Sequence, residues 1–105
     1  MAARLEHQEF AKHVHEKFRI RLNEQTIEAE LTEISEHLVS PRQERFSIIF
    51  RTSNEMLLEQ GQRPFEHDQM GNFELFIVPI GRDDQGTYYE AVFNRLTKKT
   101  DASRA

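Results

Sequence analysis

The chain has 105 residues, enough for one domain with a single hydrophobic core. Apolar residues make up 37% of it, charged residues 30%, and the mean hydropathy is -0.72. The sequence contains neither an apolar run of the roughly 20 residues that cross a membrane nor the apolar segment of a signal peptide. With no cysteine, disulfides and thiolate metal sites are excluded. We therefore expect a cytoplasmic protein without membrane contact.

Charge divides the chain into an acidic body and a basic end. Residues 1–94 contain 10 Lys and Arg against 17 Asp and Glu, whereas residues 95–105, which begin at Arg95, contain four bases and one acid. An acidic body lacks the basic stripe that a phosphate backbone needs, so nucleic-acid binding is not expected. We predict one β-rich domain over residues 1–96 and a basic, flexible tail over residues 97–105.

The first part of the chain predicts a short helix followed by a hairpin. Phe10, Val14 and Phe18 recur at helical spacing, which predicts an amphipathic helix over residues 6–16. From Lys17 onward the apolar period changes to two, which predicts strands over residues 17–22 and 27–35. A further strand is expected over residues 45–52, in the interior of a sheet. The segment from Gln62 to His67 contains Pro64, which cannot donate a backbone hydrogen bond, so we predict an edge strand there.

The last two strands form the strongest local pattern. Residues 73–80 and 87–94 flank the segment GRDDQG, which suits a hairpin connection of four to six residues. If Ile80 faces Thr87, both faces of this hairpin are apolar. One face carries Phe76, Val78, Ile80, Tyr89, Ala91 and Phe93; the other carries Phe73, Leu75, Ile77, Tyr88 and Val92. We expect the second face, together with the edge strand from Gln62 to His67, to bind a second copy or another protein. The alternatives are that the N-terminal helix covers this face or that the sheet curls until both faces enter one core.

These patterns together predict a mainly β fold. We expect six strands that form a small barrel or a two-layer sandwich, with a short N-terminal helix.

Candidate chemistry is sparse. His13 and His15 are close in sequence, but on a helix they point to opposite sides, and Glu66, His67 and Asp68 resemble a surface turn. We predict no metal and no cofactor.

Glu90 is the unusual carboxylate, because it lies in an apolar strand. If it is buried, it needs an arginine partner, for which Arg45, Arg51 and Arg95 are the candidates. A structural ion pair is favoured over a catalytic acid, and no catalytic residue is assigned.

Four segments, RFSIIFR, LEQGQRPFEHDQMG, FELFIVPIG and YYEAVFN, resemble a family of small bacterial domains of unknown function. The resemblance covers residues 8–96. Its most specific positions are Phe76, Pro79, Gly81, Tyr89, Glu90, Ala91, Phe93 and Asn94. It implies a bacterial or phage origin and an accessory role beside tail-fibre-like proteins, and it supplies no catalytic residues.

Three functions fit the sequence. The favoured one is a non-enzymatic interaction or assembly module that binds itself or another protein. The second is a β-barrel that binds a small ligand at a mouth lined by Phe and Tyr, and the third is a small enzyme that uses carboxylates at that mouth.

Overall fold

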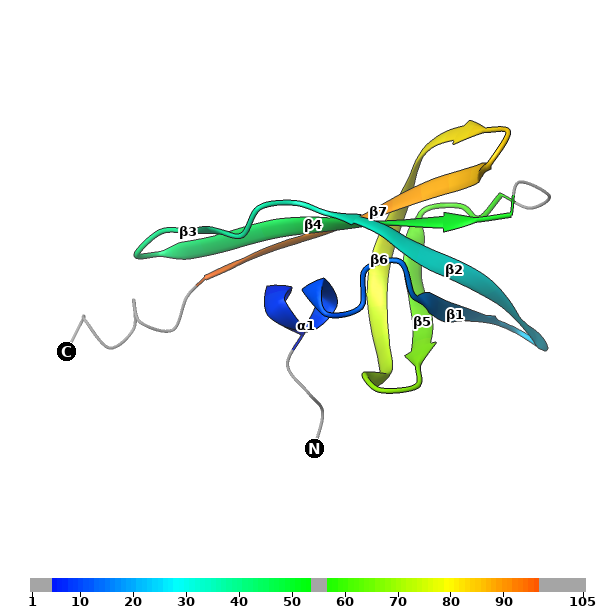
Figure 1. The fold of residues 1–105 in the computed structure, drawn as a ribbon, viewed down its shortest axis with the longest axis horizontal. Helices are drawn as coiled ribbons and strands as arrows, with labels where there is room; N and C mark the ends of the chain where they lie inside the picture. Colours follow the sequence, from blue (N-terminus) through cyan, green and yellow to red (C-terminus); the bar gives the residue numbers. More distant parts are fainter. Residues whose placement is uncertain (1–4, 54–56, 97–105) are drawn as a thin grey trace.

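The computed structural model describes residues 5–53 and 57–96, which form one short helix and seven antiparallel strands (Figure 1). The elements are α1 (His7–Ala11), β1 (Lys17–Leu22), β2 (Gln25–Ile34), β3 (Leu38–Val39), β4 (Gln43–Thr52), β5 (Gly61–His67), β6 (Gly71–Asp83) and β7 (Gly86–Leu96). The predicted mainly β fold is confirmed. The tail predicted over residues 97–105 lies outside the described residues.

Six of the strands close into a barrel. Their order is β2-β1-β5-β6-β7-β4, and β2 also pairs with β4, which joins the two ends of the sheet. In that closing ladder Glu30 faces Arg51 and Leu31 faces Phe50. Of the two predicted architectures, the barrel is therefore the one that forms. The remaining strand, β3, is an extra element that was not predicted, and it pairs with β4 outside the barrel.

The barrel interior is a filled core. Alternate residues of β4 show the expected period of two, because Phe46, Ile48 and Phe50 are buried while Ser47 and Ile49 are partly exposed. The other fully buried apolar side chains of the barrel are Phe18, Ile20, Ala29, Leu31, Phe65, Ile77 and Tyr89. Aromatic rings contact one another across this core, as the 5.2 Å and 4.9 Å centroid distances from Phe50 to Phe18 and to Phe65 show.

Beyond the barrel, three strands continue as an extended arm (Figure 1). We define the arm as β3 together with residues 43–47 of β4 and residues 92–96 of β7. The helix α1 lies against its inner face. The buried ring of Phe10 lies 6.4 Å from that of Phe46 and 5.6 Å from that of Phe93, measured between centroids. The single helix thus covers the inner face of the arm.

The helix is shorter than the prediction over residues 6–16. It ends at Ala11, and a turn leads to His15, whose φ of 75° lies in the left-handed region. The His15 N–H donates to the Leu31 carbonyl at 2.6 Å, and the Leu31 N–H donates to the Glu16 carbonyl at 3.1 Å. Because β2 bonds the chain at these positions, the helix cannot continue through them.

A strand does form from Gln62 to His67, within β5, but the prediction that it is an edge strand is wrong. β5 lies inside the closed barrel, between β1 and β6. Its ladder with β1 covers Phe65 and Glu66 and stops there, while its ladder with β6 runs from Gly61 to His67. Pro64 is tolerated because it lies just beyond the short ladder with β1, where a missing N–H removes no ladder bond.

Candidate functional site

The hairpin of β6 and β7 turns more tightly than the predicted four to six residues. Asp83 faces Gly86, so Asp84 and Gln85 alone connect the strands. Asp83 Oδ1 accepts the N–H groups of Gln85 and Gly86 at 2.8 and 3.2 Å. This side-chain capping of a two-residue turn fixes where the two strands begin to pair.

The register of the hairpin also differs from the prediction. A bulge at Ile80 separates two parts of the ladder. On the side of the bulge away from the turn, Val78 faces Glu90. The predicted pairing of Ile80 with Thr87 would instead place Ile77 opposite Glu90. A slip of one residue moves a strand's side chains to the other face of the sheet.

The five residues of the predicted interface therefore do not lie on one face of the hairpin. Leu75 and Ile77 are buried in the core and Phe73 packs against it, so these three residues lie on the inner face. Tyr88 and Val92 lie on the outer face, where Val92 is 53% exposed. The physical reason is the bulge, which a period of two cannot reveal. Whether the hairpin forms an interface stays a prediction.

An apolar surface does occur on the outside of the sheet. We call it the outer apolar face, formed by Leu38, Ile49, Phe76, Val78 and Val92. Leu38, Phe76 and Val92 expose about half of their surface, at 55, 51 and 53%. The face extends over β6, β7, β4 and β3, from the barrel wall to the arm.

Glu90 lies within the outer apolar face. It faces Val78 on one side and Ile49 on the other, and it is partly exposed. The predicted buried ion pair is not formed: Arg51 bonds Glu30 at 2.8 Å and Arg95 bonds Glu44 at 2.6 Å. The register explains this outcome, because it turns Glu90 outward. Among the described residues, no ion pair with the Glu90 carboxylate occurs.

A shallow depression adjoins this carboxylate. It has a volume of about 280 Å³ and is lined by Ser35, Glu36, Leu38, Arg45, Phe46, Ser47, Glu90 and Val92. The lining combines apolar groups with two carboxylates and one guanidinium. Such a mixture suits contact with a protein side chain better than an enclosed small molecule.

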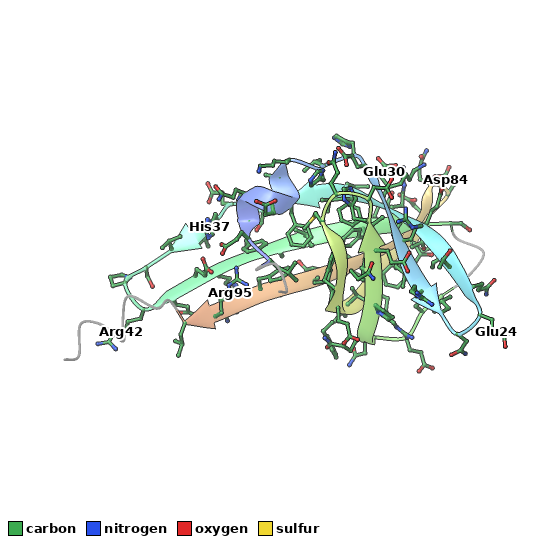
Figure 2. The ribbon with its side chains drawn as sticks, turned by 90° about the horizontal axis from the view of Figure 1, so that it is seen from below. Glu24, Glu30, His37, Arg42, Asp84 and Arg95 are labelled. Carbon is green, nitrogen blue, oxygen red and sulfur yellow. The ribbon has the colours of Figure 1, made fainter. Side chains whose placement is uncertain are left out.

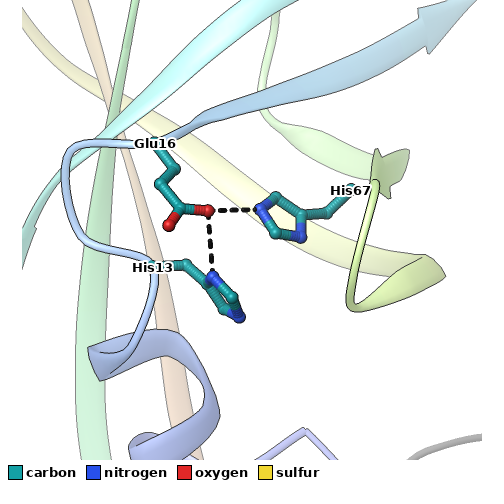
Figure 3. Close-up of side chains that lie close together, drawn as sticks. All are labelled: His13, Glu16 and His67. Carbon is teal, nitrogen blue, oxygen red and sulfur yellow. Dashed lines mark hydrogen bonds and ion pairs between the residues drawn. The ribbon is translucent and has the colours of Figure 1, made fainter.

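A second cluster lies between the turn after α1 and the end of β5 (Figure 3). Glu16 Oε1 is 2.9 Å from His13 Nδ1 and 2.9 Å from His67 Nε2. Both histidines are buried, whereas the Glu16 side chain is 47% exposed. No local pattern in the sequence predicts this cluster, because His67 comes from the end of β5, far along the chain from His13 and Glu16.

The donor set of this cluster, two histidines and one carboxylate, is one that zinc uses. The hydrogen bonds of His67 argue against a metal there. Its Nδ1 accepts the backbone N–H groups of Gln69 and Met70, both at 3.1 Å, so the proton of the neutral ring sits on Nε2. That N–H donates to the carboxylate and has no lone pair for a cation. The residues therefore fit a hydrogen-bonded cluster, not a metal site.

These bonds also set the charge of Glu16. The hydrogen bond from His67 is the largest cause that lowers the pKa of Glu16 below its ordinary value of 4.5. Partial desolvation raises the pKa, and the hydrogen bond from His13 lowers it further. A carboxylate that accepts two N–H groups is favoured in its ionised form, which ties the turn after α1 to the end of β5.

Arg95 belongs to the fold and not to the basic tail with which it was counted. Its Nε donates to Glu44 Oε2 at 2.6 Å, and a terminal nitrogen donates to the Leu5 carbonyl at 2.6 Å. Its guanidinium carbon lies 5.6 Å from the Phe93 ring centroid. The bond from Arg95, followed by that from His37, lowers the pKa of Glu44. This cluster holds the N-terminal segment against the arm.

The polar residues around the end of β5 have structural partners as well. Glu66 accepts from Arg19 at 3.3 Å and from Arg21 at 3.1 Å, and Asp68 accepts from Arg19 at 3.1 Å. The predicted surface turn is thus partly correct, since Asp68 is exposed while His67 is buried.

In the described part of the chain, no helix has the length and apolar character of a membrane span.

Comparison with known proteins adds one finding. A family model described as a domain of unknown function, DUF6916, matches residues 5–93. The chain belongs to this family. The match covers α1, all six barrel strands and most of the arm. Searches of curated proteins and of solved structures found no match. Membership in the DUF6916 family confirms the resemblance to a domain family of unknown function and assigns no activity.

Proposed function

We propose that this chain is a non-enzymatic interaction module that binds a protein partner, either a second copy or a different chain, through the outer apolar face. One observation carries the proposal: Phe76 and Val92 are each about half exposed, and each lies two residues along its strand from the facing pair Val78 and Glu90. Exposed apolar patches with polar surroundings are typical of protein-binding surfaces. The proposal includes the accessory or assembly role in a bacterial or phage-derived system that the family resemblance implied.

The distribution of cover on the arm supports this function. The inner face is covered by α1, whose Phe10 is fully buried, and Figure 1 shows the helix on one side of the arm. The described residues supply no second helix for the opposite side. No element of the described chain thus covers the large apolar side chains of the outer face, and their burial against another protein would contribute roughly 25 cal/mol per Å².

Glu90 suits a role in partner selection. A carboxylate within an apolar contact surface disfavours partners that leave it unpaired and favours partners that place a Lys or Arg opposite it. Its neighbours Val78 and Ile49 exclude water on two sides, which strengthens such a pairing. We expect the partner surface to combine an apolar centre with one basic side chain.

The filled barrel favours this function over the small-ligand and enzyme alternatives. Phe18, Phe50 and Tyr89 are fully buried, and they occupy the space that a ligand at an aromatic mouth would need. The carboxylates of Glu16 and Glu44 are engaged in structural hydrogen bonds. The groups that remain exposed on the outer apolar face therefore favour contact with another protein.

Affinity capture from the source organism tests the proposal. The full chain is compared with a Phe76→Ser/Val92→Ser variant and with a control, Lys17→Ser/Glu28→Ser, which changes an exposed ion pair on β1 and β2. We expect the control to capture as much partner as wild type does. The outer-face variant should capture at least about tenfold less, because truncation of central apolar contacts weakens interfaces strongly. Equal capture by all three proteins, or no partner and no self-association by wild type, contradicts the proposal.

A further inference from the structure

The arm contains a strand edge that its own sheet leaves open. The ladder between β6 and β7 ends where Val78 faces Glu90. Beyond that point residues 92–96 pair with β4 alone, among the residues that the structure describes. In Figure 2, seen from below, β7 runs along the margin of the arm opposite β3. One side of this segment therefore has no neighbouring strand.

Hydrogen bonds of β4 show which backbone groups face the open edge. The Ser47 carbonyl accepts from the Ser35 N–H at 2.9 Å, so Ser47 directs its backbone polar groups away from β7. Its partner in the ladder is Val92, which consequently directs its own groups away from β4. Because these directions alternate along a strand, Val92, Asn94 and Leu96 present their N–H and C=O groups to the open edge.

This edge lacks the devices that usually block strand addition. Residues 92–96 contain no proline, no lysine and no acid, and their register with β4 is continuous without a bulge. The charge of Arg95 is directed to the inner face, where Glu44 and the Leu5 carbonyl bind it. Nothing in the described segment therefore repels another strand.

We propose that the free edge of β7 pairs antiparallel with the same edge of a second copy, with Asn94 facing Asn94 of that copy. Each outward-facing pair then exchanges two backbone hydrogen bonds. On the outer side, Val92 faces Leu96 of the second copy, which joins side chains that are 53% and 78% exposed. On the inner side, Phe93 faces Arg95, so no two like charges meet.

This inference rests on the proposed function, because it names a second copy as one of the partners. The pairing extends the sheet of the arm across a twofold axis, and Val92 belongs both to the pairing edge and to the outer apolar face. Five paired residues per chain make a small interface. We therefore expect a weak, concentration-dependent dimer.

Backbone substitution at the axis tests whether the edge itself is used. The Asn94 N–H points away from β4, so Asn94→Pro removes a donor from the open edge and none from the ladder inside the chain. Asn94→Ala keeps that donor and serves as the control. Light scattering after size exclusion should give about twice 12.4 kDa for wild type and Asn94→Ala at a few hundred micromolar. Asn94→Pro should remain monomeric, with an unchanged circular dichroism spectrum.

A pair of charge variants tests the register. Val92→Lys/Leu96→Lys places lysine opposite lysine at both outer pairs and should abolish dimerisation. Val92→Glu/Leu96→Lys places opposite charges at the same pairs and should restore the dimer, most strongly at low salt. Within one chain the two positions are about 13 Å apart, so they do not pair with each other.

The outcomes separate this inference from the proposed function. A monomeric wild type at all concentrations overturns the inference, and the capture experiment then judges the proposed function alone. Dimerisation that survives Asn94→Pro, or that Val92→Glu/Leu96→Lys fails to restore, also overturns edge pairing. If such a dimer is lost in Phe76→Ser, association uses the outer apolar face, which supports the proposed function without the edge.

Discussion

Two buried histidines and one exposed carboxylate join segments that are distant in the sequence. Glu16 follows the turn after α1, and His67 ends β5. His67 also accepts two backbone N–H groups from the turn that follows it, so its ring connects that turn to Glu16 through both of its nitrogens. Substitution of His13, Glu16 or His67 should therefore change mainly the stability of the fold.

The state of His67 can be measured directly. We expect the neutral ring with its proton on Nε2, because Nδ1 accepts from Gln69 and Met70. Long-range proton–nitrogen correlation spectra distinguish the two tautomers. For the same reason Zn²⁺ should not raise the unfolding temperature of the wild type. A zinc-dependent rise that His67→Ala abolishes would contradict this assignment.

Acid stability should depend on Glu16. Its pKa is lowered in the folded state, mainly by the hydrogen bond from His67, so the ionised group stabilises the fold above about pH 4.5 and this contribution is lost as the pH falls below that value. Urea unfolding between pH 7 and pH 3 should show a smaller decline for Glu16→Gln than for wild type. Parallel declines of the two proteins would show that Glu16 is equally solvated in both states.

Two carboxylates offer a matched comparison of burial. Glu44 is 7% exposed and bonds Arg95, so Glu44→Gln should lower the free energy of unfolding by on the order of 1–3 kcal/mol. Glu90 is partly exposed without an ion pair in the described part of the chain, so Glu90→Gln should change it by less than about 0.5 kcal/mol. Chemical denaturation measures both. A larger loss for Glu90→Gln would place that carboxylate in a buried pair after all.

At the scale of elements, Gly86 fixes where the last hairpin meets β4. A Cβ at this position would lie 2.1 Å from the Thr52 carbonyl oxygen, and the φ of 153° is unusual for other residues. Gly86→Ala should destabilise the fold by more than about 1 kcal/mol. Gly81→Ala is the control, because nothing lies within 4 Å of its Cβ, and we expect a change below about 0.5 kcal/mol. Equal melting temperatures would mean that β4 and β7 can separate without cost.

Local sequence patterns predicted where the strands lie along the chain better than they predicted which strands pair and in which register. The period of two located β1, β2, β4, β6 and β7, because alternation depends on one strand and one core. It could not locate the bulge at Ile80, and this single irregularity exchanged the faces of Leu75 and Ile77. Pro64 predicted an edge strand, and this prediction was wrong. The length of the ladder between β1 and β5 depends on two strands that are distant in the sequence, so it leaves no local sign. The candidate site was hidden for the same reason: without the bulge, Phe76 and Val78 would share the inner face with Tyr89, so the pattern could not place them beside Glu90 on the outer face.

At the scale of the whole molecule, a filled barrel carries an arm with one covered face. The barrel needs no partner, since its ladders close and its interior is packed. The arm is different, because its outer face and the outer edges of β3 and β7 stay open in the described part of the chain. An interaction module needs a stable body and an exposed surface, and this division supplies both.

Hydroxyl-radical footprinting of the free chain and of its captured complex tests the central claim most directly. If a protein covers the outer apolar face, the oxidation rates of Phe76 and Val92 should fall several-fold on binding. Leu57 should keep its rate, because it is 60% exposed in the connector before β5 and is not one of the residues of that face. Binding that leaves Phe76 and Val92 as reactive as in the free chain would contradict the claim.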